Sequence, residues 1–342
     1  MLLTGHTGFK GAWLALWLHR LGAHTAALAL PAETTPNLYT LANIGALVDE
    51  AIGDIRDPNA VERAVTSSNA DIVLHLAAQA LVRRSYVAPL ETFGTNVLGT
   101  ANVLDALRLS SVAKVAVFVT TDKVYRNQEW YHPYRESDQL GGHDPYSASK
   151  AASELVIDSY RASFLQDQGM AIASARAGNV VGGGDWSQDR LIPDAMRAWL
   201  SGARLSVRNP DSTRPWQHVL EPLSAYLRLV EHLWDRPADA SAFNFGPDVS
   251  DSASVRSVVE RMQVHIAGSN VDWGAGNLIL KEASLLALDV SKARAALGIA
   301  PKWRVIDAID RTTAWYLAFN AGKSARALCD SDIDDFEATA CG

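Results

Sequence analysis

The chain alternates short continuous apolar runs with amphipathic segments over its first half, and this alternation restricts its fold more than any other feature. The apolar runs include MLLTG at the start, ADIVLHLAA around residue 75 and KVAVFVT ending at residue 120. Segments between them, such as FKGAWLALWLHRLG, carry apolar residues at helical spacing. Strands that are apolar on both faces belong to parallel sheets covered by helices on both sides. The pattern therefore predicts βαβ units and a doubly wound α/β fold.

The alternation ends near residue 180, where glycine, proline and tryptophan become frequent. We expect residues 1–180 to form the sheet domain, to which later chain returns, and residues 181–322 to form mainly a smaller α/β lobe that holds the substrate. The segment 323–342 is acidic and poor in core residues, so we expect a flexible tail. A chain of 342 residues suits one large domain or two unequal ones.

Composition and charge exclude several classes of function. The net charge of −7 provides no global basic field that would attract nucleic acid or an anionic membrane. Only Cys329 and Cys341 are present, so no disulfide framework is expected, and the histidines form no metal-ligand pattern. No signal-peptide pattern and no membrane-spanning run of about 18 apolar residues is found. We expect a cytoplasmic protein with no metal and no nucleic-acid or membrane partner.

The stretch TGHTGFKG, residues 4–11, joins the first apolar run to the first predicted helix. Its three glycines have GxxGxxG spacing, which allows a tight turn and lets the backbone approach a pyrophosphate at a helix N-terminus. A plain turn without a ligand is the alternative. The predicted cofactor contacts here are Gly5, Thr7, Gly8, Phe9, Lys10 and Gly11. The bulky His6 either crowds the pyrophosphate or points outward.

Three later stretches bear on the same cofactor. An acid that holds the adenine ribose is expected roughly 20 residues after the glycines, but the second run ends ALALPAE, so Glu33 comes late. NAD and NADP therefore both stay open. GDIRD follows the third run, and HLAAQ ends the fourth with small residues that leave room for a cofactor, a tightly packed strand end being the alternative. The predicted contacts are Asp54, Ile55, Leu76, Ala77, Ala78 and Gln79.

Two motifs carry candidate catalytic groups. Tyr146 and Lys150 in DPYSASK are four residues apart on a predicted helix, so they share one face. An unperturbed tyrosine has a pKa of about 10, and a neighbouring cation is expected to lower it toward the range of a general base. The stretch VFVTTDKVYRN, residues 117–127, places a hydroxyl, an acid and an amine directly after the fifth run. This is the carboxyl edge of the sheet, where ligands of α/β proteins bind.

Taken together, these motifs resemble the extended short-chain dehydrogenase/reductase family over roughly residues 1–320. The Thr-Asp-Lys order resembles its sugar-nucleotide 4,6-dehydratases, in particular the CDP-glucose 4,6-dehydratase subgroup, in which Lys stands where the dTDP-glucose enzymes carry Glu. The stretches TNVLGT, RAGNVVGGGDW, DRLIPD, RPWQHVLEPL and NFGP are similar to the same subgroup.

The resemblance implies a Rossmann-type NAD-binding domain and a nucleotide-sugar-binding lobe. It implies an NAD-dependent lyase that oxidises CDP-glucose at C4, eliminates water across C5–C6 and returns hydride to C6. Tyr146 would be the base, assisted by Lys150, which would also contact the cofactor ribose. Thr121 would orient the 4-hydroxyl, and Asp122 would protonate the departing 6-hydroxyl. Lys123 has two open roles, as the base at C5 or as an electrostatic stabiliser of the enolate.

The resemblance also extends to the substrate and to the assembly. Four residues lie where relatives contact the nucleotide sugar, a surface position being the alternative for each arginine: Asn179, Arg190, Arg208 and Arg214. The long helices expected at about 88–109 and 144–167 pair between subunits in relatives, which implies a homodimer. The same apolar face would also suit packing within one monomer.

Two other functions stay open. One is a dehydratase or 4-epimerase acting on another nucleotide sugar, such as dTDP-glucose or GDP-mannose. The other is a non-catalytic NAD(P)-sensing protein on the same fold. An epimerase does not need the acid and amine at positions 122 and 123, and a sensor is expected to lose Tyr146 or Lys150. All four residues are present, which favours the dehydratase.

Overall fold

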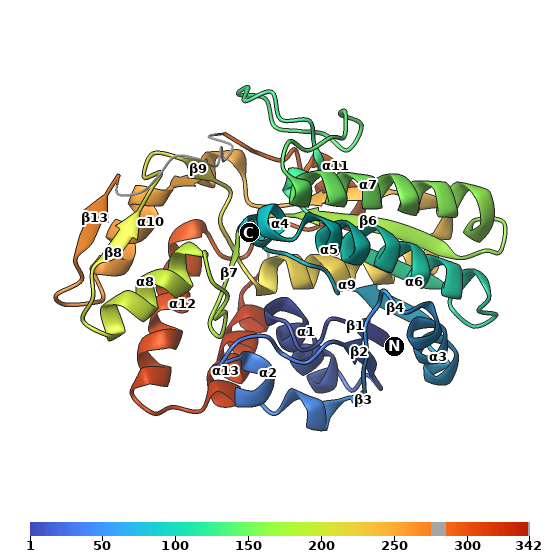
Figure 1. Ribbon diagram of the computed structural model, residues 1–342, viewed down its shortest axis with the longest axis horizontal. Coiled ribbons are helices and arrows are strands. Elements are labelled where there is room, and N and C mark those ends of the chain that lie inside the picture. Colours follow the sequence, from blue (N-terminus) through green and yellow to red (C-terminus); the bar gives the residue numbers. More distant parts are fainter. Residues whose placement is uncertain (275–284, 341–342) are drawn as a thin grey trace.

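The computed structural model describes residues 1–274 and 285–340. Within these residues the chain folds around a seven-stranded parallel sheet of order β11-β6-β5-β4-β1-β2-β3 (Figure 1). The strands are β1 Leu2–Thr4, β2 Ala26–Ala29, β3 Asp49–Ile52, β4 Ile72–His75, β5 Val115–Val119, β6 Ala171–Ala177 and β11 Ala242–Phe245. The strand order reverses between β1 and β4, which confirms the predicted doubly wound α/β fold.

Helices cover both faces of this sheet. One face carries α3 Pro58–Ser68, α6 Gly99–Arg108 and α7 Pro145–Tyr160, and the other carries α1 Phe9–Arg20 and α9 Leu220–Asp235 (Figure 1). Strand β5 shows why its sequence is apolar throughout. Val115, Val117 and Val119 belong to the core on the α1 and α9 side, whereas Ala116 and Phe118 belong to the core on the α3 and α6 side. Successive strand residues point to opposite faces, so both sets are buried.

The two long helical segments predicted at 88–109 and 144–167 are present and lie side by side (Figure 1). The first consists of α5 Pro89–Phe93, a π-helical stretch Gly94–Leu98 and α6, and the second of α7 followed by a π-helical stretch Arg161–Leu165. Helix α7 begins after Asp144, whose carboxylate accepts a hydrogen bond from the Ser147 amide at 2.9 Å. This cap fixes the start of the helix that carries Tyr146 and Lys150.

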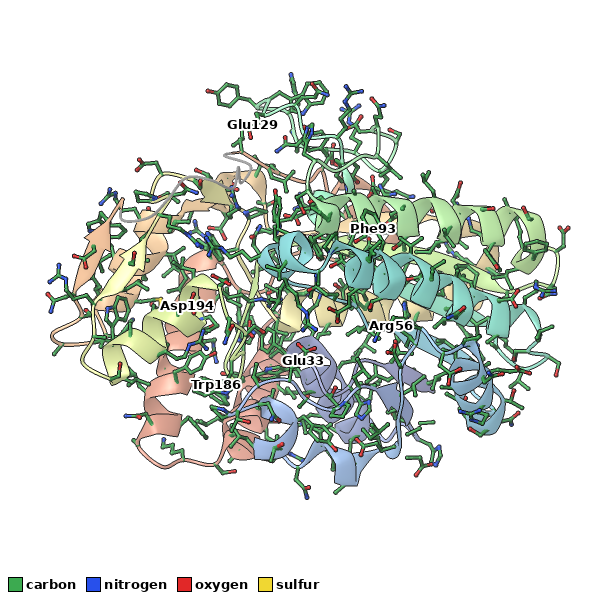
Figure 2. All side chains as sticks on the ribbon, viewed as in Figure 1. Glu33, Arg56, Phe93, Glu129, Trp186 and Asp194 are labelled. Atoms are coloured by element: carbon green, nitrogen blue, oxygen red, sulfur yellow. The ribbon has the colours of Figure 1, made fainter. Side chains whose placement is uncertain are left out.

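Between β5 and α7 the chain makes an excursion that projects from the body of the molecule, with Glu129 near its tip (Figure 2). Its base is anchored by two buried tyrosines, Tyr125 and Tyr134, whose rings stack at 5.1 Å. The Tyr134 amide also donates to the Ala287 carbonyl at 2.8 Å. The excursion is therefore tied to the second half of the chain at its base.

After β6 the chain builds a smaller lobe, at the left in Figure 1. Among the described residues its short strands pair as β10–β7, β12–β9 and β13–β8. Its elements are β7 Val180–Val181, α8 Leu191–Leu200, β8 Leu205–Val207, β9 Thr213–Arg214, β10 Gln217–His218, β12 Ala253–Ser254, α10 Val255–Gln263, β13 Val271–Trp273 and α12 Val305–Asn320. Between these pieces α9 and β11 return to the main sheet, so the two parts of the fold interleave in sequence.

The acidic segment at 323–342 differs from the expected flexible tail. Residues Ala325–Ala338 form helix α13, which packs against α12. Cys329, Ile333 and Phe336 are buried along one side of this helix, while acidic side chains on it pair with Arg20 of α1. The segment folds because its few apolar residues recur every three or four positions, and its acids meet arginines elsewhere in the chain.

Three further sequence expectations concern metal-ligand groups, membrane-spanning helices and the two cysteines. The described residues contain no group of three or more His, Cys, Asp or Glu side chains that could hold a metal ion. None of the helices described is long and apolar enough to cross a bilayer. Of the two cysteines, Cys329 is buried, and Cys341 lies outside the described residues.

Candidate active site

The glycine loop lies where the sheet reverses, between β1 and β4. Gly5 has a φ of +83°, and a Cβ placed on it would stand 2.7 Å from the Ala77 amide nitrogen. A Cβ on Gly11 would stand 2.0 Å from the Gly5 carbonyl oxygen, so the turn closes only with glycine at both positions. Gly8 precedes α1 without a side-chain cap, which leaves the first helical N–H groups for an anion. The loop fits a dinucleotide pyrophosphate.

Other predicted cofactor residues lie along the same edge of the sheet. The Thr7 hydroxyl donates to the Leu30 carbonyl at 2.8 Å, and the Ala77 amide donates to Thr4 Oγ1 at 3.2 Å. Gln79 is buried, and its backbone N–H donates to Asn96 Oδ1 at 2.9 Å. The segment directly after β4 passes beside the glycine loop, at the edge of the sheet where the cofactor is predicted to lie. It consists of Leu76, Ala77, Ala78 and Gln79.

Asp54 and Ile55 follow β3 and have different surroundings. Asp54 Oδ2 accepts a hydrogen bond from Arg56 Nε at 2.8 Å, and this guanidinium lowers the pKa of Asp54. Ile55 is buried, and a Cβ on Gly99 would stand 2.6 Å from its Cδ1. Asp54 therefore presents a charged carboxylate at the sheet edge, while the Ile55 side chain packs against the start of α6.

Two acids and His6 show pairings that the sequence did not indicate. His6 is fully buried, with Nε2 2.6 Å from Glu50 Oε1, so its ring points into the protein and not outward. Burial lowers the pKa of His6. Glu33, the late acid after β2, accepts from Arg84 NH1 at 2.9 Å. Both pairs join segments far apart in the sequence, so local spacing gave no signal for them.

The polar residues Thr121, Asp122 and Lys123 after β5 form a compact group, which we call the catalytic corner after the role predicted for it. Thr121 Oγ1 and Lys123 Nζ both donate to Asp122 Oδ1 at 2.9 Å. Asn179 Nδ2 donates to the other carboxylate oxygen at 3.3 Å. Asp122 has no exposed surface. The carboxylate is therefore fixed from both sides by side chains of the chain itself.

Gly178 lies against the catalytic corner and was not predicted from the sequence. A Cβ at Gly178 would stand 2.1 Å from the Asp122 carboxylate, so the carboxylate packs directly against the Gly178 backbone and leaves no room for a side chain there. The signal was available in RAGNVV, because a glycine directly after a buried strand often marks a close approach of backbone to another group.

Tyr146 and Lys150 lie on one face of α7 and are both buried. Lys150 Nζ donates to the Val119 carbonyl at 3.3 Å, and burial lowers the pKa of Lys150 to about 8 against the opposing charge of Glu154. Burial raises the pKa of Tyr146 to about 12, opposed by a hydrogen bond with Thr121. The expected lowering of the Tyr146 pKa is therefore not found, because loss of hydration outweighs the Thr121 hydrogen bond and the charge of Arg190.

Lys10 reaches this group from the glycine loop. Its Nζ donates to Tyr226 OH at 3.4 Å. Burial and the charges of Lys150 and Arg190 lower the pKa of Lys10 to about 7, while Asp122 acts in the opposite direction. These influences mean that Lys10 of the glycine loop lies near Asp122, Lys150 of α7 and Arg190 of the lobe.

The four predicted substrate residues fall into two groups. Asn179 contacts Asp122 directly, and Arg190 lies close enough to Tyr146 to interact with it electrostatically while its NH1 donates to Asp185 Oδ2 at 2.9 Å. Arg208 and Arg214 have contacts within the lobe: Arg208 NH1 lies 3.9 Å from Asp189 Oδ1, and Arg214 NH1 donates to the Thr213 carbonyl at 3.0 Å.

Arg83 is a cationic residue at this edge that the sequence analysis did not assign. It lies in α4 Val82–Val87, and its NH1 stands 3.1 Å from Asp189 Oδ1, the oxygen that Arg208 also approaches. Arg83 Nε is buried without a hydrogen-bond partner in the described residues. One arginine from the sheet domain and one from the lobe thus share a single carboxylate. Arg83 ends the HLAAQALVR stretch that had indicated the cofactor site, but no local sequence pattern predicts that it pairs with Asp189.

Fold and site together define a Rossmann-type nucleotide-binding protein with a buried Tyr/Lys pair and a Thr-Asp-Lys corner. The chain matches the family model described as GDP-mannose 4,6 dehydratase over residues 2–312. It therefore belongs to this family of sugar-nucleotide dehydratases, which confirms the resemblance found in the sequence.

Individual relatives agree with this assignment. The chain is 42% identical to CDP-glucose 4,6-dehydratase of Salmonella typhimurium over 98% of this chain and 95% of that protein. It is 29% identical to dTDP-glucose 4,6-dehydratase of Streptomyces antibioticus, with 92% of each chain covered. Among solved structures, DesIV, the dTDP-glucose 4,6-dehydratase of Streptomyces venezuelae with NAD and TYD bound, superposes with a TM-score of 0.79 at 23% identity, covering 94% of this chain and 97% of that one.

Proposed function

We propose that the chain is an NAD-dependent 4,6-dehydratase that converts CDP-D-glucose to CDP-4-dehydro-6-deoxy-D-glucose. The buried Asp122, held by Thr121 and Lys123 beside Tyr146, is the observation that carries the proposal. A 4-epimerase needs only a base at the 4-hydroxyl, whereas loss of water across C5–C6 also needs an acid at O6 and a base at C5. The preference for CDP-glucose rests on the relative that is 42% identical.

The glycine loop and the ends of β3 and β4 are proposed to hold the cofactor. Gly5, Gly8 and Gly11 let the backbone approach the pyrophosphate, and Lys150 reaches the nicotinamide ribose. We propose NAD as this cofactor because DesIV, which shares the fold, was solved with NAD bound. When bound, NAD supplies a hydride acceptor at C4 and a hydride donor at C6.

Tyr146 is proposed to take the proton of the sugar 4-hydroxyl. Its pKa of about 12 in the chain alone must fall for this role, and the charges that would lower it are the Lys150 ammonium and the cationic nicotinamide ring. Thr121 Oγ1 is proposed to hydrogen-bond the same sugar oxygen and fix its orientation. The resulting C4 ketone acidifies the C5 hydrogen, which prepares the elimination.

Asp122 is proposed to donate a proton to the departing 6-hydroxyl, and Lys123 to act beside it. Asp122 is buried and accepts a hydrogen bond from Lys123, and transfer of that one proton to the carboxylate gives an acid for O6 beside a free amine for C5. Lys123 Nζ lies 2.9 Å from the Asp122 carboxylate. We propose that the free amine takes the C5 proton and that the ammonium so formed stabilises the C5 enolate. Asp122 then protonates the departing 6-hydroxyl, which restores the ion pair.

The lobe residues are proposed to hold the nucleotide diphosphate. Arg190, Arg208 and Arg214 offer guanidinium groups, whose paired N–H donors match phosphate oxygens. Asn179 is proposed to position the sugar against Asp122. In this arrangement the reacting hexose lies between the catalytic corner and Tyr146, and the diphosphate extends along the lobe.

A homodimer through the long helices is also proposed. The segments α5 to α7 and the π-helical stretch after α7 expose several apolar side chains: Leu90 at 87%, Leu98 at 64%, Leu155 at 63% and Phe164 at 44%. Figure 2 labels Phe93 of α5, which is 37% exposed. An apolar strip on adjoining helices suits a partner copy.

Leu155→Glu tests the dimer by placing a charge in this strip. We expect the variant to be monomeric by light scattering at concentrations where the unaltered chain is dimeric. Val264→Glu, at a residue that is 71% exposed after α10, is the matched control and should leave the mass unchanged. A monomeric wild-type chain would contradict the proposed assembly.

The proposed reaction is tested with CDP-glucose, dTDP-glucose and GDP-mannose in separate incubations, each with and without added NAD. The 4-keto-6-deoxy product is followed by its alkali-induced ultraviolet absorbance. We expect turnover of CDP-glucose and dependence on NAD in protein freed of bound nucleotide. Turnover of another sugar alone would overturn the CDP preference, and formation of a 4-epimer would overturn the dehydratase.

A further inference from the structure

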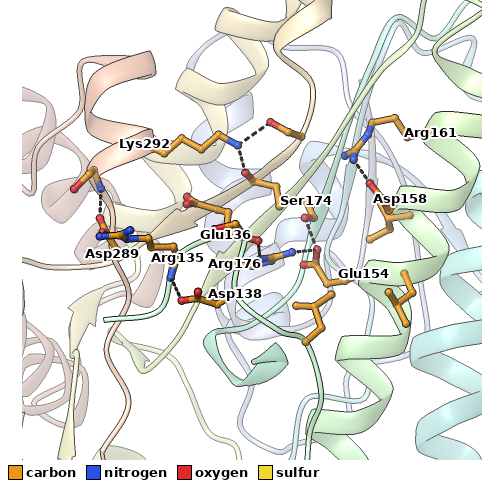
Figure 3. Close-up of a pocket in the computed structure, with 17 residues that line it drawn as sticks. Arg135, Glu136, Asp138, Glu154, Asp158, Arg161, Ser174, Arg176, Asp289 and Lys292 are labelled. Atoms are coloured by element: carbon orange, nitrogen blue, oxygen red, sulfur yellow. Dashed lines mark hydrogen bonds and ion pairs between the residues drawn. The ribbon is translucent and has the colours of Figure 1, made fainter. Parts of the chain in front are cut away.

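Glu154 is a buried carboxylate that the proposed chemistry does not use. It lies on α7 one turn beyond Lys150 and is 4% exposed. Oε1 accepts from Thr120 Oγ1 at 2.5 Å, and Oε2 accepts from Ser174 Oγ at 2.7 Å and Arg176 NH2 at 2.8 Å. Figure 3 shows Ser174 and Arg176, both on β6, directed at the Glu154 carboxylate. One side chain thus joins α7 to β6 and to the residue that follows β5.

Thr120 connects this carboxylate to the catalytic corner. It directly precedes Thr121, and its amide donates to the Ala175 carbonyl at 2.9 Å, which continues the β5–β6 pairing by one residue. Its side chain is 6% exposed and points toward α7. The Thr120–Glu154 bond therefore fixes the point at which β5 ends and the backbone turns to present Thr121 and Asp122.

On its other side Glu154 faces solvent-accessible space. A cavity of about 780 Å³ is lined by Glu154, Ser174 and Arg176 together with Asp158 and Lys292 (Figure 3). Arg176 NH1 is held in addition by Tyr125 OH at 2.9 Å and the Glu136 carbonyl at 3.1 Å. The buried Glu154–Arg176 pair therefore has the cavity on one side and the Thr120 hydroxyl on the other.

We propose that Glu154 is a positioning residue for the dehydratase reaction: through Thr120 it sets the backbone from which the catalytic corner presents its side chains. The proposal rests on the proposed function. The hydrogen-bond partners of the Glu154 carboxylate are Thr120, Ser174 and Arg176, and of these Thr120 is the one that adjoins the catalytic corner. Its charge has a second, supporting influence, because it raises the pKa of Lys150 against the effect of burial.

The test uses Thr120 because a change at Glu154 would leave the buried Arg176 charge unpaired and endanger folding. Thr120→Val keeps the shape but removes the hydroxyl, and Thr120→Ser keeps the hydroxyl. Ser174→Ala is the matched control, since it removes another donor to the same carboxylate without touching the catalytic corner. We expect Thr120→Val to lower kcat by about tenfold or more at a KM within about twofold of wild type. Thr120→Ser should restore kcat, and Ser174→Ala should leave it unchanged.

A second readout does not depend on turnover. Hydrogen exchange of the backbone at residues 120–124 should rise in Thr120→Val and stay at the wild-type level in Ser174→Ala. Unchanged kcat and unchanged exchange in Thr120→Val would overturn the proposal, as would an equal loss of kcat in Ser174→Ala. A wild-type chain without dehydratase activity would overturn the proposed function, and the exchange result would still decide whether Glu154 holds the catalytic corner.

Discussion

The catalytic corner and the arginine-bearing edge of the lobe are both proposed to contact the substrate, but the chain holds their side chains in different ways. At the corner, Asp122 has no exposed surface and accepts from Thr121, Lys123 and Asn179. Its partners come from neighbouring strand ends of the rigid sheet. Such groups are in place before a substrate arrives, and this preorganisation is the main source of electrostatic catalysis.

The lobe edge instead pairs its cations with the chain's own acids. Arg83 and Arg208 share Asp189, and the side chains of these two arginines are 36% and 31% exposed. A diphosphate offers better-matched acceptors for the same guanidinium groups. The comparison teaches that the proposed reacting end is built in advance, whereas the arginines at the lobe edge are paired with an internal carboxylate that a bound diphosphate would have to replace.

The largest expected effect lies in the preorganised half. Asp122→Asn keeps the size of the side chain but removes the proton proposed for O6. We expect kcat to fall by about 10²–10⁴-fold, the usual contribution of a positioned acid. CDP-glucose and NAD binding, measured by calorimetry, should stay within about twofold because no binding contact is lost. A variant that retains kcat would show that Asp122 is only a structural acceptor.

A second prediction concerns the stability cost of preorganisation. Lys150 is buried, and its pKa is about 8 in the fold against a usual 10.5. Between these values the unfolded chain binds more protons, so this group makes stability rise with pH, and at pH 8 and below the buried charge costs roughly 3 kcal/mol. Lys150→Met should therefore raise the free energy of unfolding at pH 7.

The pH dependence provides the check on this assignment. Urea unfolding of wild type and Lys150→Met at pH 7 and pH 10 should show the advantage of the variant shrinking at the higher pH. A variant that is less stable at both pH values would mean that the lysine's hydrogen bond to Val119 outweighs the cost of burying its charge.

The smallest effect is expected at the lobe edge. Asp189→Asn removes the carboxylate that competes for Arg83 and Arg208, so we expect KM for the nucleotide sugar to fall by about threefold with kcat unchanged, as befits half-exposed charges. Asp211→Asn, which alters a surface pair with Arg256, is the matched control for net charge. A rise in KM would show that Asp189 orients the arginines and does not compete with the substrate.

Sequence alone predicts the parts of this molecule that depend on local spacing. The glycine loop, the Tyr146 and Lys150 face and the polar residues after β5 all lie within short stretches whose geometry follows from one turn, one helix or one strand end. These stretches predicted the α/β fold, and they predicted that most of the candidate site residues lie at the carboxyl edge of the sheet.

The remaining features depend on contacts between distant segments. Gly178 under Asp122, Arg83 on Asp189 and Thr120 on Glu154 each join residues that no local pattern links. The raised pKa of Tyr146 is of the same kind, because burial by the whole fold determines it and the lysine one turn away does not. Helix α13 was not predicted because its acidic composition favours a flexible tail, although its four buried residues recur every three or four positions.

The measurement that tests the central claim most directly is the reaction with CDP-glucose and NAD in deuterated water, with the product identified by nuclear magnetic resonance. The account predicts a 4-keto-6-deoxy sugar with deuterium at C5, because the catalytic corner removes water across C5–C6 and C5 is then reprotonated from solvent. A 4-epimer with no deuterium at C5 would show that the chain moves hydride at C4 alone, and it would contradict the roles assigned to Asp122 and Lys123.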